Sequence, residues 1–338
     1  MKNKKSVSKK TRAASLESAL GPLWKYYADT EVREIFINSF DKASAERKGK
    51  LEALPPLFSS RAAVTALVKN LAALPGSVSR RPGGAAGKVL ELRLADLTKV
   101  TCAEGAAYQA VIISKMPAGL PGWAELVRHG CLPEEGKKLF EKILGEMKSV
   151  LVAGSNCSGK TTLMDILANG LPAGRRVVAI QGDSGLALRH PAALCLDASS
   201  DEEFVELLRS ADKFLPDYLV VDSLDGIGAP EVVRAMRNGL AVIASCHAES
   251  ALDALKRLEY MYLSSRTSFG LDEIRSLLAS GIGYISFQER AADGKRRVTE
   301  LSRLDGYEDG RYLLTPLLKY NYETGAFELT PAGKAALA

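Results

Sequence analysis

The chain has 338 residues, of which 46% are hydrophobic and 25% are charged, and its formal net charge is +5 at pH 7. This length suits two domains, each large enough to bury its own core, and the composition is typical of globular proteins. No apolar run approaches the roughly 20 residues that a membrane-spanning helix needs, and no secretory signal peptide is recognisable, so we expect a cytoplasmic protein and not an integral membrane protein.

The N-terminal segment, residues 1–15, is basic. Its cations are Lys2, Lys4, Lys5, Lys9, Lys10 and Arg12. Together they exceed the net charge of the whole chain, so the remainder is nearly neutral and carries no basic footprint for nucleic acid. We interpret this segment as a disordered, solvated tail, with attachment to an acidic membrane surface as the alternative.

The cysteines indicate a reducing compartment. All 5 are spread singly along the chain, without a Cys-x-x-Cys pair, which favours reduced thiols over disulfides or a zinc site. Cys157 differs from the others because it lies inside a glycine-rich loop, where the start of a helix can lower a thiol pKa. A residue at a tolerant loop position is the other interpretation.

The first part of the chain alternates between strand and helix patterns. Apolar residues predict two strands joined by a turn over residues 31–45, and further strands over residues 89–94 and 108–115. A single apolar face predicts a helix over residues 61–74. The glycines and prolines of residues 75–88 predict a loop.

A second break in the pattern marks the domain boundary. Residues 117–121 read Pro-Ala-Gly-Leu-Pro, and a helix is predicted over residues 133–147, just before a buried strand. We therefore expect an N-terminal α/β domain at residues 16–125 and a second domain at residues 126–338.

The second domain begins with the strongest motif in the chain. Gly154 to Thr161 read Gly-Ser-Asn-Cys-Ser-Gly-Lys-Thr, a full match to the phosphate-binding loop pattern G-x-x-x-x-G-K-[ST]. An apolar run at residues 149–153 predicts a strand before the loop, and residues 161–169 have the spacing of a helix. Strand, loop and helix therefore follow in the order that triphosphate binding requires, and a chance match is the alternative.

Each residue type in this loop has a chemical role. Gly154 and Gly159 let backbone N–H groups point at the phosphates, beside the positive end of the new helix. Lys160 would reach the β- and γ-phosphates, and the hydroxyl of Thr161 would bind Mg²⁺. The predicted nucleotide-binding residues are Gly154, Ser155, Asn156, Cys157, Ser158, Gly159, Lys160, Thr161 and Thr162.

Short apolar runs separated by polar helical segments follow the loop. They cover residues 176–180, 218–221 and 241–245, and this alternation predicts βαβ units with a mainly parallel sheet.

The last part of the chain has a different pattern. Residues 283–289, 297–304 and 312–318 look like antiparallel strands, with tight turns expected at Asp293-Gly294 and Asp309-Gly310. We therefore expect an antiparallel C-terminal extension of the sheet.

Polar residues stand where three of the predicted parallel strands end. Asp222 follows an apolar strand, where a carboxylate can hold the water shell of Mg²⁺ or polarise the attacking water; an acid that merely starts a turn is the alternative. His247 could sense the γ-phosphate or be structural, and it is one of 3 histidines in the chain. Asp183 is another acid at the same edge of the sheet. The predicted catalytic residues are Lys160, Asp183, Asp222 and His247.

At these strand ends the chain resembles the secretion ATPases of type II and type IV systems and of pili, especially the VirB11-like branch of tight-adherence pili and conjugation. The acidic segment of that family resembles residues 180–191. Its Arg-Pro-Asp and Val-Gly-Glu segments resemble residues 215–217 and 220–226. Its histidine segment is similar to residues 246–249 and 254–259.

Some positions depart from the family pattern. The catalytic glutamate of the family falls on Asp222, which is one methylene shorter, and the arginine two residues later falls on Leu224. The acidic pair of the earlier segment falls on Gln181 and Gly182. We therefore expect ATP binding to be intact and ATP hydrolysis to be slower, since a misplacement of about 1 Å can lower a rate about a hundredfold.

The resemblance implies an ATPase motor that uses ATP and Mg²⁺, with Thr161 and, through water, Asp222 as metal ligands. It implies a RecA-like ATPase domain after the N-terminal domain and a homo-oligomer, most often a hexamer. It also implies a cytoplasmic location at the inner membrane, where a platform protein of a pilus or secretion system is the partner. A cation from the first domain or from a neighbouring subunit would complete the site, with Arg93, Lys115 and Arg209 as candidates.

Two other functions stay open. One is a catalytically weak or inactive ATP-binding ring component with a regulatory or structural role. The other is a nucleic-acid translocating ATPase or a kinase, although neither a basic channel nor a lid signature is visible. A GTPase is not expected, because the Asn-Lys-x-Asp motif that reads guanine is absent.

Overall fold

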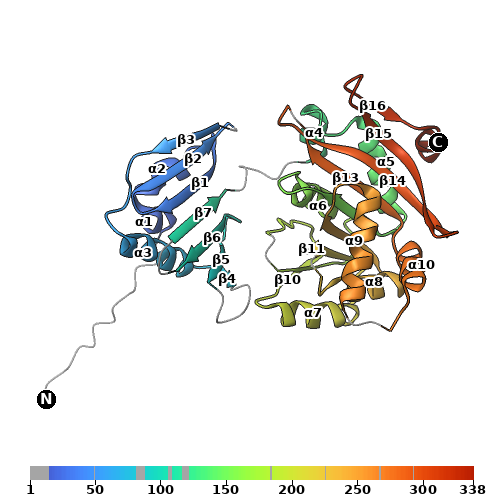
Figure 1. The fold of residues 1–338 in the computed structure, drawn as a ribbon, viewed down its shortest axis with the longest axis horizontal. Coiled ribbons are helices and arrows are strands. Elements are labelled where there is room, and N and C mark those ends of the chain that lie inside the picture. The colour runs from blue at the N-terminus through green and yellow to red at the C-terminus, as the bar shows by residue number, and fades with distance from the viewer. Residues whose placement is uncertain are drawn as a thin grey trace, which may run out of the picture. The chain divides into compact units, whose positions relative to one another are not determined.

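The computed structural model describes residues 15–48, 50–80, 88–105, 109–115, 122–182, 185–224, 226–265, 268–291 and 293–338. The chain divides into two compact units, Met1–Ala118 and Gly119–Ala338 (Figure 1). This division lies a few residues before the boundary that we expect after residue 125. Residues 1–14 of the expected tail, and Asp183 of the expected site, lie outside the described residues.

The first unit is an antiparallel sheet with one longer helix. In its described part the strand order is β3-β2-β1-β7-β6-β5-β4. Helix α3 (Arg61–Ala72) begins after Ser60, whose hydroxyl accepts from the amide of Ala63, and its apolar face packs into the core of the sheet. The strands are β1 (Val32–Ser39), β2 (Lys42–Arg47), β3 (Lys50–Leu54), β4 (Val78–Arg80), β5 (Val89–Arg93), β6 (Lys99–Glu104) and β7 (Gln109–Ser114). The short helices are α1 (Leu16–Leu20), η1 (Gly21–Leu23) and α2 (Trp24–Tyr27).

The predicted elements of this unit are largely confirmed. The strand pair expected over residues 31–45 is β1 and β2, and α3, β5 and β7 match the other predictions. The loop predicted over residues 75–88 is wrong in part, because it includes β4. Strand β3 has no counterpart in the prediction because it is an exposed edge strand without a buried face, and its place is set by pairing with β2.

The second unit is built on one mainly parallel sheet. In its described part the order is β10-β9-β11-β12-β8-β13-β14-β15-β16. Pairs from β10 to β13 are parallel and those from β13 to β16 are antiparallel. The strands are β8 (Val150–Gly154), β9 (Val177–Gln181), β10 (Ala193–Asp197), β11 (Tyr218–Leu224), β12 (Ala241–His247), β13 (Tyr284–Arg290), β14 (Arg296–Glu308), β15 (Arg311–Asn321) and β16 (Ala326–Leu329). The predicted α/β class, with a parallel ATPase sheet and an antiparallel extension, is confirmed.

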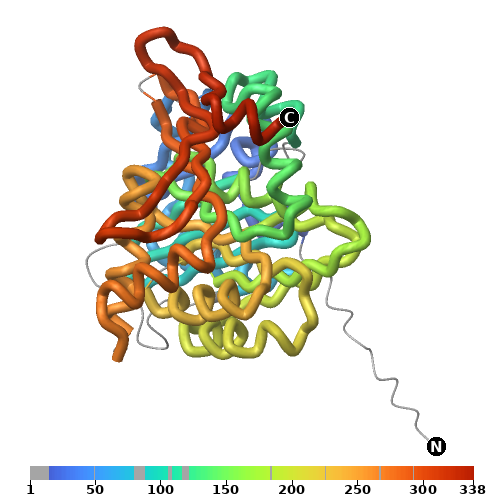
Figure 2. The backbone as a smooth tube through the Cα atoms, turned by 90° about the vertical axis from the view of Figure 1, so that its right-hand side faces the viewer, coloured from blue at the N-terminus to red at the C-terminus, as the bar shows by residue number. Residues whose placement is uncertain are grey.

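Helices cover both faces of this sheet. Leu151 and Ala153 of β8 share a core with α7 to α10, whereas Val150 and Val152 share a core with α5 and α6 (Figure 1). This division follows from the alternation of side chains along a strand. Helix α11 lies beside α5, although the two are far apart in the chain (Figure 2). The helices are α4 (Trp123–Arg128), α5 (Glu134–Gly145), α6 (Lys160–Asn169), α7 (Asp201–Arg209), η3 (Ala211–Phe214), α8 (Ala229–Arg237), α9 (Ala251–Ser264), α10 (Leu271–Gly281) and α11 (Pro331–Leu337).

The two predicted tight turns are confirmed. Gly294 has φ 79°, Asp309 has φ 48° and Gly310 has φ 77°, a backbone region that glycine adopts without steric cost. The turns join β13 to β14 and β14 to β15. Within the described ranges, no helix combines the length and the apolar character needed to cross a bilayer.

Candidate nucleotide-binding site

The phosphate loop connects the end of β8 to the start of α6. Gly154 lies between two neighbouring strands, paired with His247 of β12 on one side and Gln288 of β13 on the other. A Cβ atom at Gly154 would collide with the backbone oxygen of Gln288 and come within 2.7 Å of the hydroxyl of Ser158. Gly159 has φ 99° at the start of α6. The backbone therefore requires glycine at both positions where the motif has it.

Lys160 folds back onto its own loop. Its ammonium nitrogen donates to the carbonyl oxygens of Gly154 at 3.0 Å and Ser155 at 2.8 Å, and it lies 3.2 Å from Nδ1 of His247. Burial lowers the pKa of Lys160, although the charge of Asp222 opposes this shift. The cation is thus held within the loop by groups that a phosphate oxygen can replace.

His247 reaches the loop from the end of β12. An ammonium group only donates, so Nδ1 of His247 accepts from Lys160, and the imidazole is then neutral with its proton on Nε2. Burial lowers the pKa of His247, and the nearby charges of Lys160 and Arg257 lower it further. His247 thus lies at a strand end beside the phosphate loop.

Asp222 is buried at a bulge in β11. The residue is only 3% exposed, and its Oδ1 accepts a hydrogen bond from the hydroxyl of Ser245 on β12. The same hydroxyl accepts the amide of Ser223 at 2.8 Å, and Ser223 has φ 62°. The bulge and Ser245 together fix the direction of the carboxylate, and among the described residues its Oδ2 has no hydrogen-bond partner.

Three side chains hold the segment that follows β9. Gln181 accepts the amide of Leu186 at 3.0 Å, and Asp165 of α6 accepts the amide of Ala187 at 2.7 Å. Asn169, one turn further along α6, accepts the amide of Arg189 at 2.6 Å. Burial raises the pKa of Asp165 to about 7, and the charge of Asp222 adds to this effect.

Sequence reasoning missed Asp165 and Ser245. Asp165 stands among apolar residues of α6. An acid at such a position could have indicated a buried carboxylate that needs a hydrogen-bond donor. Ser245 became visible only through the pairing of β11 with β12, because it stands inside an apolar run. The sequence comparison noted Gln181 only as a departure from the family's acidic pair, whereas in the structure its side-chain oxygen accepts the amide of Leu186.

The remaining loop residues differ in exposure. Ser158 is fully buried, whereas Ser155, Asn156 and Cys157 are exposed, and Thr161 at the helix start is half-buried. Thr162 is half-buried one residue further along α6. Within the described ranges, no group of three or more His, Cys, Asp or Glu side chains is placed to hold a metal ion.

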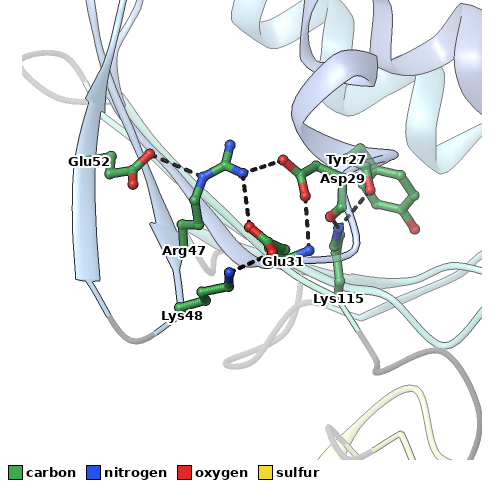
Figure 3. Close-up of polar contacts among 7 residues, drawn as sticks. All are labelled: Tyr27, Asp29, Glu31, Arg47, Lys48, Glu52 and Lys115. Carbon is green, nitrogen blue, oxygen red and sulfur yellow. Dashed lines mark hydrogen bonds and ion pairs between the residues drawn. The ribbon is translucent and has the colours of Figure 1, made fainter.

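The candidate cations Lys115 and Arg209 contact partners in their own units. Lys115 donates to the backbone oxygens of Tyr27 at 2.6 Å and Asp29 at 2.5 Å, and burial lowers its pKa (Figure 3). The carboxylate of Asp29 also forms an ion pair with Arg47. Lys115 therefore belongs to a polar cluster that connects the end of β7 with the segment before β1 (Figure 3). Arg209 pairs with Glu231 at 2.7 Å. Arg93 ends β5.

The chain matches a known protein family over most of its length. The family model described as "Type II/IV secretion system protein" matches residues 35–288. The chain is 29% identical over 188 residues to the type IV secretion system protein VirB11 of Bartonella quintana (strain Toulouse), a match that covers 52% of this chain and 52% of that protein. The chain thus spans about half the length of the curated relatives that it matches.

Two solved structures have a similar fold. The ATPase DotB of Legionella pneumophila superposes with a TM-score of 0.59 at 15% identity, covering 85% of this chain and 80% of that one. The pilus retraction motor PilT with bound ADP superposes with a TM-score of 0.55 at 16% identity, covering 93% of this chain and 84% of that one. At these identities the likeness concerns the fold alone.

Proposed function

Because the chain belongs to the type II/IV secretion system protein family, we propose that it is an ATP-binding and ATP-hydrolysing motor subunit that powers pilus assembly or protein secretion. One observation carries this proposal. The phosphate loop follows β8, and β8 lies in the same sheet as β12, which ends at His247, and β11, which carries the buried Asp222. A loop alone predicts triphosphate binding, whereas an acid and a histidine on the next two strands support the proposal of hydrolysis.

The loop residues fit a triphosphate. Gly154 and Gly159 leave the backbone free to approach an anion, and the first N–H groups of α6 have no partner inside the helix. On binding, Lys160 exchanges its bonds to the Gly154 and Ser155 carbonyls for the β- and γ-phosphate oxygens. The solved PilT structure, which has ADP bound, supports this assignment by fold.

Thr161 and Asp222 are the residues that would hold Mg²⁺, Asp222 through a water molecule. The ion supplies charge neutralisation on the β- and γ-phosphate oxygens. Oδ2 of Asp222 suits this role, because a buried carboxylate oxygen without a partner is costly unless a ligand or water satisfies it. The same carboxylate would polarise the attacking water as a general base. We keep Asp183, which lies outside the described residues, as a candidate second acid.

His247 would report the state of the γ-phosphate. Its Nδ1 accepts a hydrogen bond from Lys160 in the structure. When Lys160 turns to the phosphates, that acceptor is released, so the end of β12 changes its contacts with the occupancy of the loop.

We further propose that the chain works as a homo-oligomer, a hexamer by resemblance, in the cytoplasm at the inner membrane. Its partner would be a membrane platform protein of a pilus or secretion system. The named relatives, a type IV secretion protein and a pilus retraction motor, support this assignment. A neighbouring subunit would supply the cation that completes each site.

A ring component that binds ATP without efficient hydrolysis is the second candidate. Gln181 favours it, because the side chain at this position is neutral and binds the Leu186 amide. Asp222→Glu distinguishes the two candidates. Faster phosphate release from this variant would identify the short carboxylate as the limiting feature of a motor. Tight ATP binding without phosphate release in both proteins would favour the second candidate.

The motor role is tested in cells that carry Lys160→Ala at the natural locus. We expect loss of the filament or of the exported protein, with the variant present at its normal level. An unchanged filament and secretion phenotype would refute the motor role.

A further inference from the structure

The hairpin of β13 and β14 presents an arginine to the phosphate loop. Its turn is fixed by Asp293, whose carboxylate accepts two hydrogen bonds from the guanidinium of Arg297, at 3.0 and 2.6 Å, and one from the amide of Lys295 at 3.0 Å. The bond to Arg297 lowers the pKa of Asp293 to about 2. Asp293 is thus bonded to the residues on both sides of Arg296.

Arg296 contacts the loop in two ways. Its Nε donates to the backbone carbonyl of Cys157 at 2.8 Å. Its Cδ lies 3.3 Å from the position that a Cβ of Gly159 would take, so its aliphatic part packs on the second glycine of the motif. The first glycine, Gly154, is in contact with the backbone of Gln288 on β13. The two strands of one hairpin thus touch both glycines of the loop.

The backbone of the loop needs such support at Cys157. Cys157 has φ 58°, a conformation that residues other than glycine adopt at a cost of about 1 to 3 kcal/mol and keep only when neighbours hold them. In a trans peptide the C=O and the following N–H point in opposite directions. A bond that fixes the carbonyl of Cys157 therefore also fixes the direction of the Ser158 N–H. This N–H donates a long hydrogen bond of 3.4 Å to the Ser155 oxygen, which an anion in the loop can replace as acceptor.

We propose that Arg296 is a positioning residue of the phosphate loop, which holds the Cys157 carbonyl so that the Ser158 amide is directed for an anion before nucleotide binds. The hydrogen bond from Nε, and not the charge of the guanidinium, is what carries this role. The identity of the anion, the phosphate of a nucleoside triphosphate, rests on the proposed function. The effect of Arg296 on the conformation of the loop can be measured without any nucleotide.

The test uses three variants of the full-length protein. Arg296→Ala removes the donor, and Arg296→Gln keeps a neutral N–H donor on Cδ, where Arg296 has Nε. Lys295→Ala removes the exposed neighbouring cation and serves as the matched control. The first readout is the rate at which N-ethylmaleimide labels Cys157 without nucleotide, at a pH where the thiol is fully ionised, followed by mass spectrometry. Cys195, exposed on β10, is the internal reference.

We expect Arg296→Ala to raise the Cys157 rate at least threefold and to leave the Cys195 rate unchanged, while Arg296→Gln and Lys295→Ala stay within twofold of wild type. An unchanged Cys157 rate in Arg296→Ala would overturn the proposal. So would equal acceleration of both cysteines, which indicates general loosening, or an Arg296→Gln rate equal to that of Arg296→Ala, which indicates a role of charge.

The second readout is the dissociation constant of a fluorescent ATP analogue with Mg²⁺. We expect about a tenfold increase for Arg296→Ala, the size of one hydrogen bond to a charged group, and less than threefold for Arg296→Gln and Lys295→Ala. Wild-type affinity in Arg296→Ala would overturn the proposal. If the wild-type protein itself fails to bind the analogue, the proposed function fails, and the labelling rates still decide the role of Arg296.

Discussion

Replacing Asp165 by asparagine should stabilise the second unit above neutral pH. Asp165 is 1% exposed on α6, and its carboxylate accepts the amide of Ala187. Asparagine keeps an acceptor oxygen of the same shape and removes the charge. Burial, with a further contribution from Asp222, raises the pKa of Asp165 to about 7, so the folded chain must ionise a buried acid as the pH rises.

The sign and size follow from proton linkage. A raised carboxyl pKa means that the folded state binds more protons than the unfolded one, so its stabilising contribution is full below about pH 4 and is lost as the pH rises to about 7. Each pH unit in this window lowers the free energy of unfolding by about 1.4 kcal/mol. Between pH 5.5 and about pH 8 the stability of Asp165→Asn relative to wild type should therefore rise by about 2 kcal/mol, most of it below pH 7, and then stay constant.

Urea unfolding followed by Trp123 fluorescence measures this difference. Trp123 stacks on Phe140 in the core of the second unit, and Trp24→Phe removes the other tryptophan, which lies in the first unit. Both proteins are compared in this background at pH 5.5, 6.3, 7 and 8.5. A stability difference that does not change with pH would refute the reasoning, because it would mean that Asp165 is ionised throughout.

Three further predictions concern the loop, the acid and a buried ion pair. Gly154→Ala should raise the dissociation constant for the fluorescent ATP analogue at least tenfold, because its Cβ collides with the Gln288 backbone, whereas Gly174→Ala, with open space around it, should bind normally. Asp222→Asn should lower steady-state phosphate release about a hundredfold while the dissociation constant for the ATP analogue changes less than threefold. The reason is that the amide keeps the bond to Ser245 and cannot act as a base. A hundredfold weaker binding of the analogue would contradict this role. Arg275→Ala should lower the urea-unfolding free energy by about 2 kcal/mol, because it leaves the buried carboxylate of Glu259 without its 3.1 Å partner, and Arg257→Ala, which breaks an exposed pair, should change it little; equal effects would contradict the argument.

The features that the sequence predicted best are local in the chain. The phosphate loop is eight consecutive residues between a strand and a helix, so its motif and its context could be read together. Asp222 and His247 could be placed because the carboxyl ends of parallel strands meet at one edge of a sheet. Buried strands such as β8 and β11 were predictable because a continuous apolar run is a local pattern in the sequence.

The features that escaped prediction depend on contacts between distant segments. Arg296 is 139 positions from Cys157, and only the register of the β13–β14 hairpin brings them together. Ser245 meets Asp222 through the pairing of two strands, with a bulge that no local pattern indicates. Edge strand β10 lacks a fully buried face, so neither alternation nor an apolar run identified it.

The most direct test of the account is phosphate release from ATP by the purified full-length protein, compared between wild type and Lys160→Ala. The account predicts Mg²⁺-dependent release by wild type and its loss in Lys160→Ala, because Lys160 is the loop cation for the β- and γ-phosphates. Equal release by both proteins would contradict the claim that this loop holds the ATP that is hydrolysed.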